Sequence, residues 1–250
     1  MSKKQIACLI TGAAGTIGQE LVKAFSERSY FVIGVDSRDA PADMDYGCYI
    51  QNDLSCIVED EAYANAMKEK VLHETAGRSI HTLINNAAVQ RLGSTDKLNR
   101  DDWHETMSVN LLAPFFLSQL FLGELERSSG CIINVGSVHA SLTKSGFVAY
   151  ATSKASLRAL TRSMAVDLGP RVRINAIEPG AVDTPLLQAG FEGKETSLEL
   201  LATMHPSARI ARPEEIANVA VWLAMEAPSF LHGACISVDG GISGRLHDAL

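Results

Sequence analysis

Short apolar segments of strand length recur along the chain, and stretches with helical spacing follow most of them. The apolar segments cover residues 6–10, 30–35, 48–51, 82–84, 131–135, 172–177 and 234–238. Continuous apolar runs of this length are typical of parallel strands that are buried on both faces. The alternation predicts an α/β fold of the Rossmann type, a doubly wound parallel sheet of about seven strands with helices on both faces.

The predicted helices cover residues 17–28, 59–75, 101–126, 150–168 and 213–227. We find no internal repeat and no low-complexity linker, so we expect residues 1–250 to form a single domain. One long irregular segment, 183–212, contains Pro185, Gly190, Gly193 and Pro206, and a short helix is predicted over 198–204. Because long insertions in regular α/β domains usually serve function, we expect this segment to be a substrate lid.

Charge and composition exclude several classes of partner. The chain has 22 Lys and Arg against 29 Asp and Glu, a net charge of −7, and its basic residues are scattered, which argues against nucleic acid and membrane surfaces as partners. No apolar run approaches the roughly 18 residues of a membrane span, so we expect a cytoplasmic protein. The five cysteines are widely spaced and form no CxxC pair, so we expect neither a disulfide framework nor a metal site.

A glycine-rich turn joins the first predicted strand to the first predicted helix. It contains Gly12, Gly15, Thr16, Ile17 and Gly18. Glycines let the backbone turn tightly and approach a pyrophosphate, whose charge the N–H groups at a helix start stabilise. An ordinary tight turn is the alternative, but the position directly after the first strand favours a dinucleotide site.

Polar residues follow the next strands at the same edge of the predicted sheet. Asp36 ends the second strand, where its carboxylate can bind the adenosine ribose hydroxyls and repel a 2′-phosphate, so NAD is favoured over NADP. Arg38 can partly neutralise that repulsion, and a turn-forming aspartate is the alternative. Asp53 and the segment 85–88 extend the same edge, although each can also cap a turn.

Tyr150 and Lys154 lie one helical turn apart, so both side chains rise from the same face. A free tyrosine titrates near pH ~10, but a nearby ammonium and an oxidised nicotinamide both favour the phenolate, which makes Tyr150 a candidate acid and base. The same spacing is also common on solvated helices. Ser137 favours the catalytic interpretation, because it follows the strand 131–135 and can hydrogen-bond a reacting oxygen.

Pro114 lies four residues after Asn110 within the predicted helix 101–126. Proline has no N–H to donate, so the helix should be kinked there, with the Asn110 carbonyl left to a water or a side-chain donor. The same helix is apolar nearly all round, which indicates burial on more than one side. We therefore expect a subunit interface here and a homo-oligomer, either a tetramer or a dimer.

Taken together, these residues resemble the short-chain dehydrogenase/reductase family, in its single-domain branch of about 250 residues. The resemblance covers nearly the whole chain, and its markers occur in order at 11–18, Asp36, 53–54, 85–88, Asn110, Ser137, 150–154, 179–184 and 238–241. It implies a nicotinamide cofactor and hydride transfer at a CH–OH group.

The resemblance also implies individual roles. Tyr150 would be the general acid and base, Ser137 would polarise the carbonyl, and Lys154 would lower the Tyr150 pKa and bind the nicotinamide ribose. Asn110 would hold a water that links Lys154 to solvent. Cofactor contacts are implied for Gly12, Gly15, Thr16, Ile17, Gly18, Asp36, Asp53, Leu54, Asn86, Ala87, Tyr150, Lys154, Pro179, Gly180, Val182 and Thr184.

Two positions depart from the family pattern. The branch usually reads TGxxxGxG, whereas Gly15 and Thr16 give this chain the TGxxGxxG spacing of the longer epimerase and dehydratase relatives. Those relatives carry an extra C-terminal region that this chain lacks, so we assign the shorter branch. Ala88 stands where the usual motif has glycine, which exchanges one small residue for another.

The substrate pocket is expected to include Gln90, Ser137, His139, Phe147 and Tyr150. Gln90 and His139 resemble residues of 3-hydroxybutyrate dehydrogenases, and a Ser-Val-His stretch also occurs in sugar-oxidising relatives. Phe147, however, stands where the hydroxybutyrate enzymes have a lysine, and His139 can also be a structural histidine. We expect a small polyol, sugar or hydroxy acid. The alternatives are an epimerase or dehydratase without net redox change, and a cofactor-binding regulator without turnover.

Overall fold

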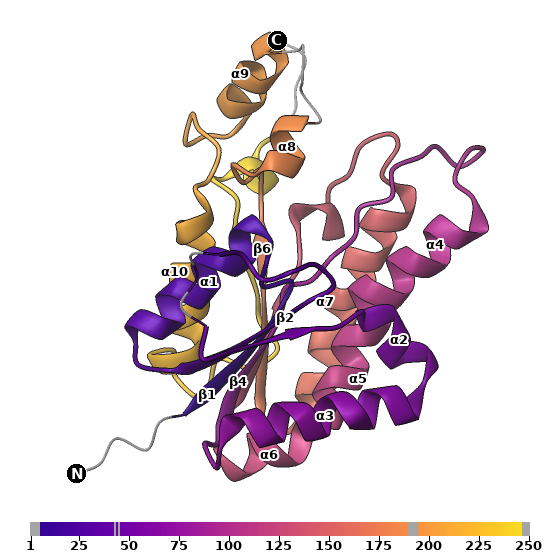
Figure 1. Ribbon diagram of the computed structural model, residues 1–250. Helices are drawn as coiled ribbons and strands as arrows, with labels where there is room; N and C mark the ends of the chain where they lie inside the picture. Colours follow the sequence, from indigo (N-terminus) through magenta and orange to yellow (C-terminus); the bar gives the residue numbers. More distant parts are fainter. Residues whose placement is uncertain (1–5, 43, 45, 190–194, 247–250) are drawn as a thin grey trace.

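The computed structural model describes residues 6–42, 44, 46–189 and 195–246. Seven strands form one sheet in the order β3-β2-β1-β4-β5-β6-β7, and every neighbouring pair is parallel. The predicted Rossmann-like α/β fold is therefore confirmed (Figure 1). The strands are β1 (Ala7–Thr11), β2 (Phe31–Asp36), β3 (Cys48–Gln51), β4 (Ile80–Asn85), β5 (Cys131–Val135), β6 (Arg173–Pro179) and β7 (Cys235–Val238).

The central strands are largely apolar because each face of the sheet has its own core. Along β1, Leu9 packs into one core and Ile10 into the other, and both side chains are fully buried. Burial of one such side chain contributes about 1.5–3 kcal/mol, so a strand covered on both faces gains from every position. This explains why the apolar runs do not alternate with polar residues.

Helices cover both faces of the sheet (Figure 1). The core on one face includes residues of α1 (Thr16–Glu27) and α10 (Pro213–Met225). The core on the other includes residues of α2 (Leu54–Glu59), α3 (Glu61–Thr75), α5 (Ala113–Leu120), α6 (Leu122–Arg127) and α7 (Val148–Leu168). This two-sided covering leaves the carboxyl ends of the strands free to carry the candidate site.

Two predicted helices are interrupted. The prediction of one continuous helix over 101–126 is wrong. Instead, α4 (Arg100–Met107) runs into a π turn, η1 (Ser108–Leu112), before α5 and α6 begin. The Ala113 amide donates to the Ser108 carbonyl, so the irregularity expected before Pro114 is present as this wider turn. The helix expected over 59–75 is divided at Asp60, whose carboxylate caps the start of α3.

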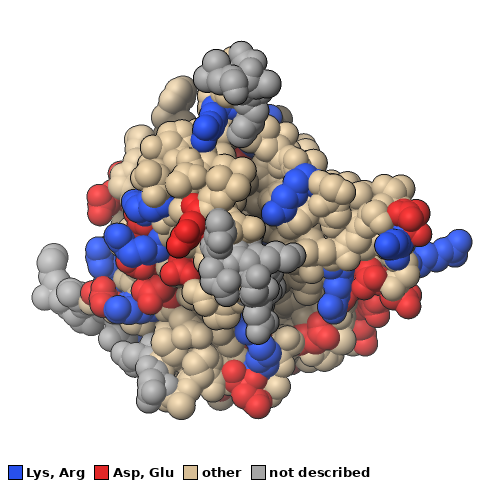
Figure 2. Space-filling model, turned by 90° about the horizontal axis from the view of Figure 1, so that it is seen from above, with Lys and Arg blue, Asp and Glu red and all other residues tan. Residues whose placement is uncertain are grey.

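Above the carboxyl edge of the sheet stand two further helices, α8 (Pro185–Ala189) and α9 (Glu195–Met204), within the predicted lid (Figure 1). The short helix predicted over 198–204 is present and begins earlier, at Glu195, while Gly190 and Gly193 lie outside the described residues. On the face seen from above, acidic and basic side chains are interspersed (Figure 2). No helix in the described part of the chain has the length and apolar character needed to cross a membrane.

Candidate active site

The glycine-rich turn lies between β1 and α1, as predicted. Gly12 has a positive φ of 65°, and a Cβ on Gly18 would lie 2.0 Å from the Gly12 carbonyl oxygen, so this turn requires glycine at both positions. Gly15 caps α1 without a side-chain hydrogen bond, and Thr16 and Ile17 begin the helix. The first amides of α1 are thus not occupied by a capping side chain, which fits a phosphate-binding helix start.

Asn86 and Ala87 hold this turn in place from the end of β4. The Asn86 side-chain amide donates to the Thr11 and Gly12 carbonyls at 3.0 and 3.1 Å. The backbone amides of Asn86 and Ala87 both donate to the Thr11 hydroxyl at 3.1 Å. Thr11 was not predicted as a site residue, although it opens the glycine motif. Its hydroxyl connects the glycine-rich turn to the segment that follows β4.

Asp36 lies beside the same turn, at the end of β2. Its carboxylate accepts hydrogen bonds from the Ala14 amide at 3.0 Å and from the Arg38 side chain at 2.9 and 3.0 Å. Burial opposes its ionisation, but the hydrogen bonds from Arg38 and Ala14 outweigh burial and lower the pKa of Asp36. The carboxylate is therefore charged at neutral pH, with a cation paired to it.

The two residues expected beside the adenine have structural partners of their own. Asp53 caps α2, and its carboxylate accepts from the Ser55 amide at 2.9 Å and the Ser55 hydroxyl at 2.8 Å. Leu54 is buried in the core shared with α3 and α5. Their contact with a cofactor stays a prediction.

Ser137, Tyr150 and Lys154 come together at the carboxyl end of β5. Ser137 precedes the 3₁₀ turn η2 (Val138–Ala140), and its hydroxyl hydrogen-bonds to the Tyr150 side chain. The Lys154 Nζ lies 5.8 Å from the centroid of the Tyr150 ring and donates to the Val135 carbonyl at 2.8 Å. The sequence spacing on α7 therefore corresponds to one cluster in space.

Burial shifts the two titratable groups of this cluster in opposite directions. It raises the pKa of Tyr150, and the hydrogen bond with Ser137 offsets this only in part. It lowers the pKa of Lys154 to about 8. Both shifts favour the neutral form, because a buried site penalises either charge. In this state Tyr150 is thus a protonated phenol, poised as an acid.

Asn110 lies in the π turn and is fully buried. Its side-chain oxygen accepts from the Val89 amide at 2.8 Å, and its side-chain nitrogen donates to the Val89 carbonyl at 2.9 Å and to the Ser153 hydroxyl at 3.0 Å. Asn110 therefore links the segment before Gln90 to the helix turn that carries Lys154. The predicted water on its backbone carbonyl stays a prediction.

Two of the predicted substrate residues form an aromatic stack beside Tyr150. The rings of His139 and Phe147 are nearly parallel, with centroids 4.5 Å apart, and each meets the Tyr150 ring edge to face. The Lys144 ammonium lies over the Phe147 ring, 4.7 Å from its centroid. Burial, together with the charge of Lys144, lowers the pKa of His139 to about 4. At neutral pH His139 is therefore uncharged, and Lys144 is the charged member of the stack.

The segment expected to position the nicotinamide follows β6. Pro179 ends the strand, the Gly180 amide donates to the Val238 carbonyl at 3.1 Å, and Val182 is buried. Thr184 immediately precedes α8, and its hydroxyl accepts from the Leu187 amide at 3.2 Å. The segment is thus held by β7 and continues directly into the predicted lid.

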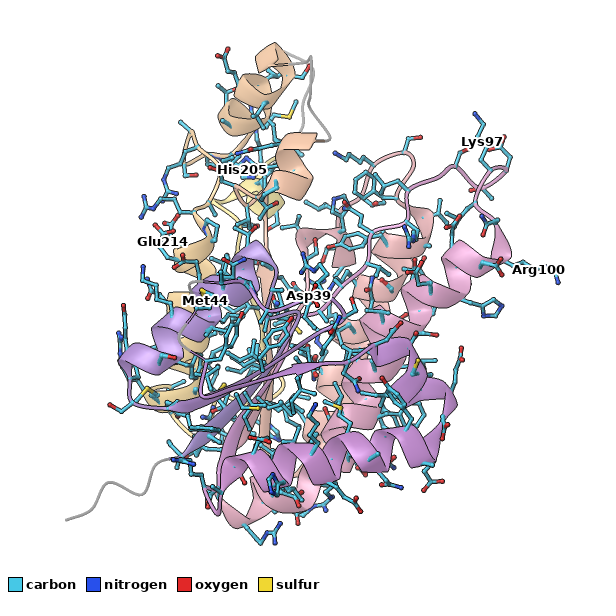
Figure 3. All side chains as sticks on the ribbon, viewed as in Figure 1. Asp39, Met44, Lys97, Arg100, His205 and Glu214 are labelled. Carbon is cyan, nitrogen blue, oxygen red and sulfur yellow. The ribbon has the colours of Figure 1, made fainter. Side chains whose placement is uncertain are left out.

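His205 was missed by the sequence analysis, because nothing in its local spacing marks it. It is buried below α9, where it accepts from the Ala181 amide at 3.4 Å and donates to the Leu201 carbonyl at 2.8 Å (Figure 3). These two hydrogen bonds connect α9 to the segment that follows β6.

Comparisons with known proteins agree with this arrangement. A family model described as enoyl-(acyl carrier protein) reductase matches residues 12–243. D-threitol dehydrogenase of Mycolicibacterium smegmatis is 33% identical over 243 residues, which cover 93% of this chain and 91% of the relative. The ligand-free structure of aldohexose dehydrogenase from Thermoplasma acidophilum is 29% identical, with a TM-score of 0.91, and the match covers 100% of this chain and 98% of that one. A 4-hydroxyisoleucine dehydrogenase complexed with NADH is 26% identical, with a TM-score of 0.86, and covers 97% of this chain and 100% of its own.

Proposed function

The chain belongs to the short-chain dehydrogenase/reductase family, and on that premise we propose that it transfers hydride between NAD(H) and a small polyol, sugar or hydroxy acid. The observation that carries the proposal is the cluster of Ser137, Tyr150 and Lys154 at the carboxyl end of β5. Ligands of open α/β sheets bind at this edge. The named substrates of the three similar proteins are a polyol, a sugar and a hydroxy amino acid, which is the range of the proposal.

The chain's own residues supply the proton chemistry. The nicotinamide ring, when bound, would accept or supply the hydride. In oxidation, the hydride leaves the carbinol carbon with its bonding electrons while the O–H proton passes to Tyr150. In reduction, the Tyr150 phenol donates its proton to the oxygen that the hydride makes electron-rich, and Ser137 would hydrogen-bond that oxygen in both directions.

Lys154 and Asn110 would support the proton transfer. A charged Lys154 favours the phenolate of Tyr150 by Coulomb attraction, and an oxidised nicotinamide would add to it. This attraction would oppose the effect of burial, which raises the pKa of Tyr150. A water on the Asn110 carbonyl would carry the proton from Lys154 to solvent, which is the role that the resemblance gives to this residue.

The glycine turn and Asp36 would hold the cofactor. The uncapped start of α1 suits the pyrophosphate, and the ionised Asp36 suits ribose hydroxyls and repels a 2′-phosphate, which favours NAD. Arg38 is paired to Asp36 and offsets part of that repulsion, but its guanidinium is already occupied by Asp36, so a 2′-phosphate would have to compete with this carboxylate for it.

A second copy of the chain is the proposed partner. Leu112 and Phe115 lie in the π turn and α5, and each is 37% exposed although both are large apolar residues. Helices already cover this face of the sheet, yet these two apolar side chains remain partly exposed. Association with a second copy would remove them from water. Light scattering at micromolar protein should give a dimer or tetramer mass, and a monomer mass would contradict this.

A substrate screen with a Tyr150→Phe comparison tests the function. The purified enzyme is assayed with NAD and NADP against sugars, polyols and hydroxy acids at the NADH absorbance. We expect NAD reduction that Tyr150→Phe lowers about 10²–10⁴-fold, while NADH binding measured by fluorescence stays intact. Substrate turnover without net NADH would instead support an epimerase or dehydratase, and cofactor binding without any Tyr150-dependent turnover would support a regulator.

A further inference from the structure

A partly buried ion pair lies next to the candidate active site. Arg158 follows Lys154 by one turn of α7, and its Nε and Nη2 atoms both donate to the carboxylate of Glu178 on β6. Glu178 is 1% exposed and Arg158 is a quarter exposed by side chain. Hydrogen bonding to Glu178 raises the pKa of Arg158, so the guanidinium is charged throughout the working pH range.

The same guanidinium has a third partner. Its Nη1 atom donates to the hydroxyl of Ser141, the residue that ends the η2 turn. One side chain therefore joins the helix that carries Tyr150, the strand that leads into Gly180, and the turn that starts at Ser137. A guanidinium is planar and presents its donors at fixed angles, so it sets the relative position of the groups it binds.

Glu178 also packs against the backbone that carries Ser137. A Cβ on Gly136 would lie 3.0 Å from the Glu178 Cγ, so the carboxylate side chain lies directly against this glycine. The Gly136 amide donates to the Ile177 carbonyl at 2.7 Å, which fixes the connection from the other side. A movement of Glu178 toward Gly136 would therefore displace the chain immediately before Ser137.

We infer that Arg158 and Glu178 are positioning residues, whose ion pair holds the segment 136–141 against α7 and β6 so that Ser137 and His139 face Tyr150. The inference rests on the proposed function and adds two residues that act through Ser137. A stabilising role alone would not explain the pair well, because apolar residues of similar volume can often replace a buried ion pair without loss of stability.

A double variant distinguishes a positioning role of the ion pair from a stabilising one. The double variant Arg158→Met, Glu178→Leu removes both charges and keeps the volume, so we expect a urea midpoint near that of the wild type. We expect its kcat to fall roughly 10- to 100-fold, because displacement of a reacting group by about 1 Å costs this much, while the KM for NAD changes less than about threefold. The control Arg171→Met, Glu126→Leu removes an ion pair at the other end of α7 and should leave kcat unchanged.

Amide hydrogen exchange gives a readout that does not depend on turnover. The amides of Ala140, Ser141 and Leu142 donate to the carbonyls of Ser137 and Val138. In the double variant these amides should exchange faster, with the rest of the chain unchanged. The inference would be overturned if the double variant exchanged these amides at the wild-type rate. It would also be overturned if the double variant kept both the stability and the kcat of the wild type.

Ser141→Ala covers the case in which the double variant does not fold. It removes one hydrogen bond to Arg158 and exposes no buried charge, so we expect faster exchange over 140–142 and a two- to fivefold lower kcat. Unchanged exchange and kcat would again contradict the inference. If the wild type itself shows no Tyr150-dependent turnover, the proposed function fails, while the exchange measurement still decides whether the pair positions the segment.

Discussion

Lys154 reaches from α7 to the end of β5, where its ammonium donates a hydrogen bond at 2.8 Å to the carbonyl of Val135. Lys154 is 2% exposed, and its ammonium also lies 5.8 Å from the centroid of the Tyr150 ring. One hydrogen bond does not replace full hydration of an ammonium, and burial lowers the pKa of Lys154 to about 8.

Stability should therefore depend on pH through Lys154. Between pH ~8 and the ordinary lysine value of 10.5, the unfolded chain keeps a proton that the folded chain has released, so the free energy of unfolding rises with pH in this window. Lys154→Met lacks this contribution. The difference in unfolding free energy, wild type minus variant, should increase between pH 8 and pH 10 in urea titrations.

The control for this measurement is Lys97→Met. Lys97 is exposed and lies at the outer tip of the molecule (Figure 3). Its loss should leave the pH dependence of unfolding parallel to that of the wild type. Parallel curves for Lys154→Met as well would show that Lys154 keeps its ordinary pKa in the folded protein.

Cofactor preference should follow the Asp36 and Arg38 pair. Asp36→Asn removes the charge that repels a 2′-phosphate, so the ratio of kcat/KM with NAD to that with NADP should fall on the order of tenfold. Arg38→Met removes the only described cation bonded to Asp36, so the ratio should rise. Asp39→Asn, at an exposed neighbouring position, serves as the control and should leave the ratio unchanged (Figure 3). A wild type that prefers NADP would contradict the assignment.

Lys144 offers a test of the substrate class. It is the charged member of the stack with Phe147 and His139, so a substrate carboxylate beside Tyr150 would gain from its ammonium and a neutral polyol would not. In Lys144→Gln, kcat/KM for hydroxy acids relative to polyols should fall about fivefold, and more at low ionic strength than at high. An unchanged ratio would place the substrate away from this side of the stack.

The elements that sequence predicted best are those whose signal lies within one short stretch of the chain. The apolar run of β1 is explained by burial on both faces, and the spacing of Tyr150 and Lys154 by one helical turn. Gly12 and Gly18 are required by a local turn, so their pattern was visible in the sequence. In each case the residues that carry the signal are close in the chain, even where their packing partners are distant.

The relationships that sequence could not supply are those made by tertiary packing. Arg158 and Glu178 are far apart in the chain, and nothing in either neighbourhood marks the other as its partner. His205, which follows α9, is connected to Ala181 after β6 only in the folded chain, and the two are 24 residues apart in the sequence. The sequence pointed to the backbone carbonyl of Asn110. The structure shows that its side chain makes hydrogen bonds with Val89 and Ser153.

Those contacts lead to a graded prediction for stability. Asn110→Leu would leave the Val89 amide and carbonyl without their partner in a partly buried setting, so we expect a loss of about 2–3 kcal/mol in the free energy of unfolding. Ser153→Ala removes one hydrogen bond to the same side chain and should cost about 1 kcal/mol. Urea unfolding at neutral pH measures both variants.

The position of the Val89 segment gives the same variants a kinetic consequence. Gln90 follows Val89 directly, so loosening this segment should raise the KM for substrate in Asn110→Leu more than in Ser153→Ala, with NADH binding little affected. Equal losses of stability in the two variants would show that Asn110 contributes mainly through Ser153. A KM that stays unchanged in Asn110→Leu would show that the Val89 segment does not set the substrate side of the pocket.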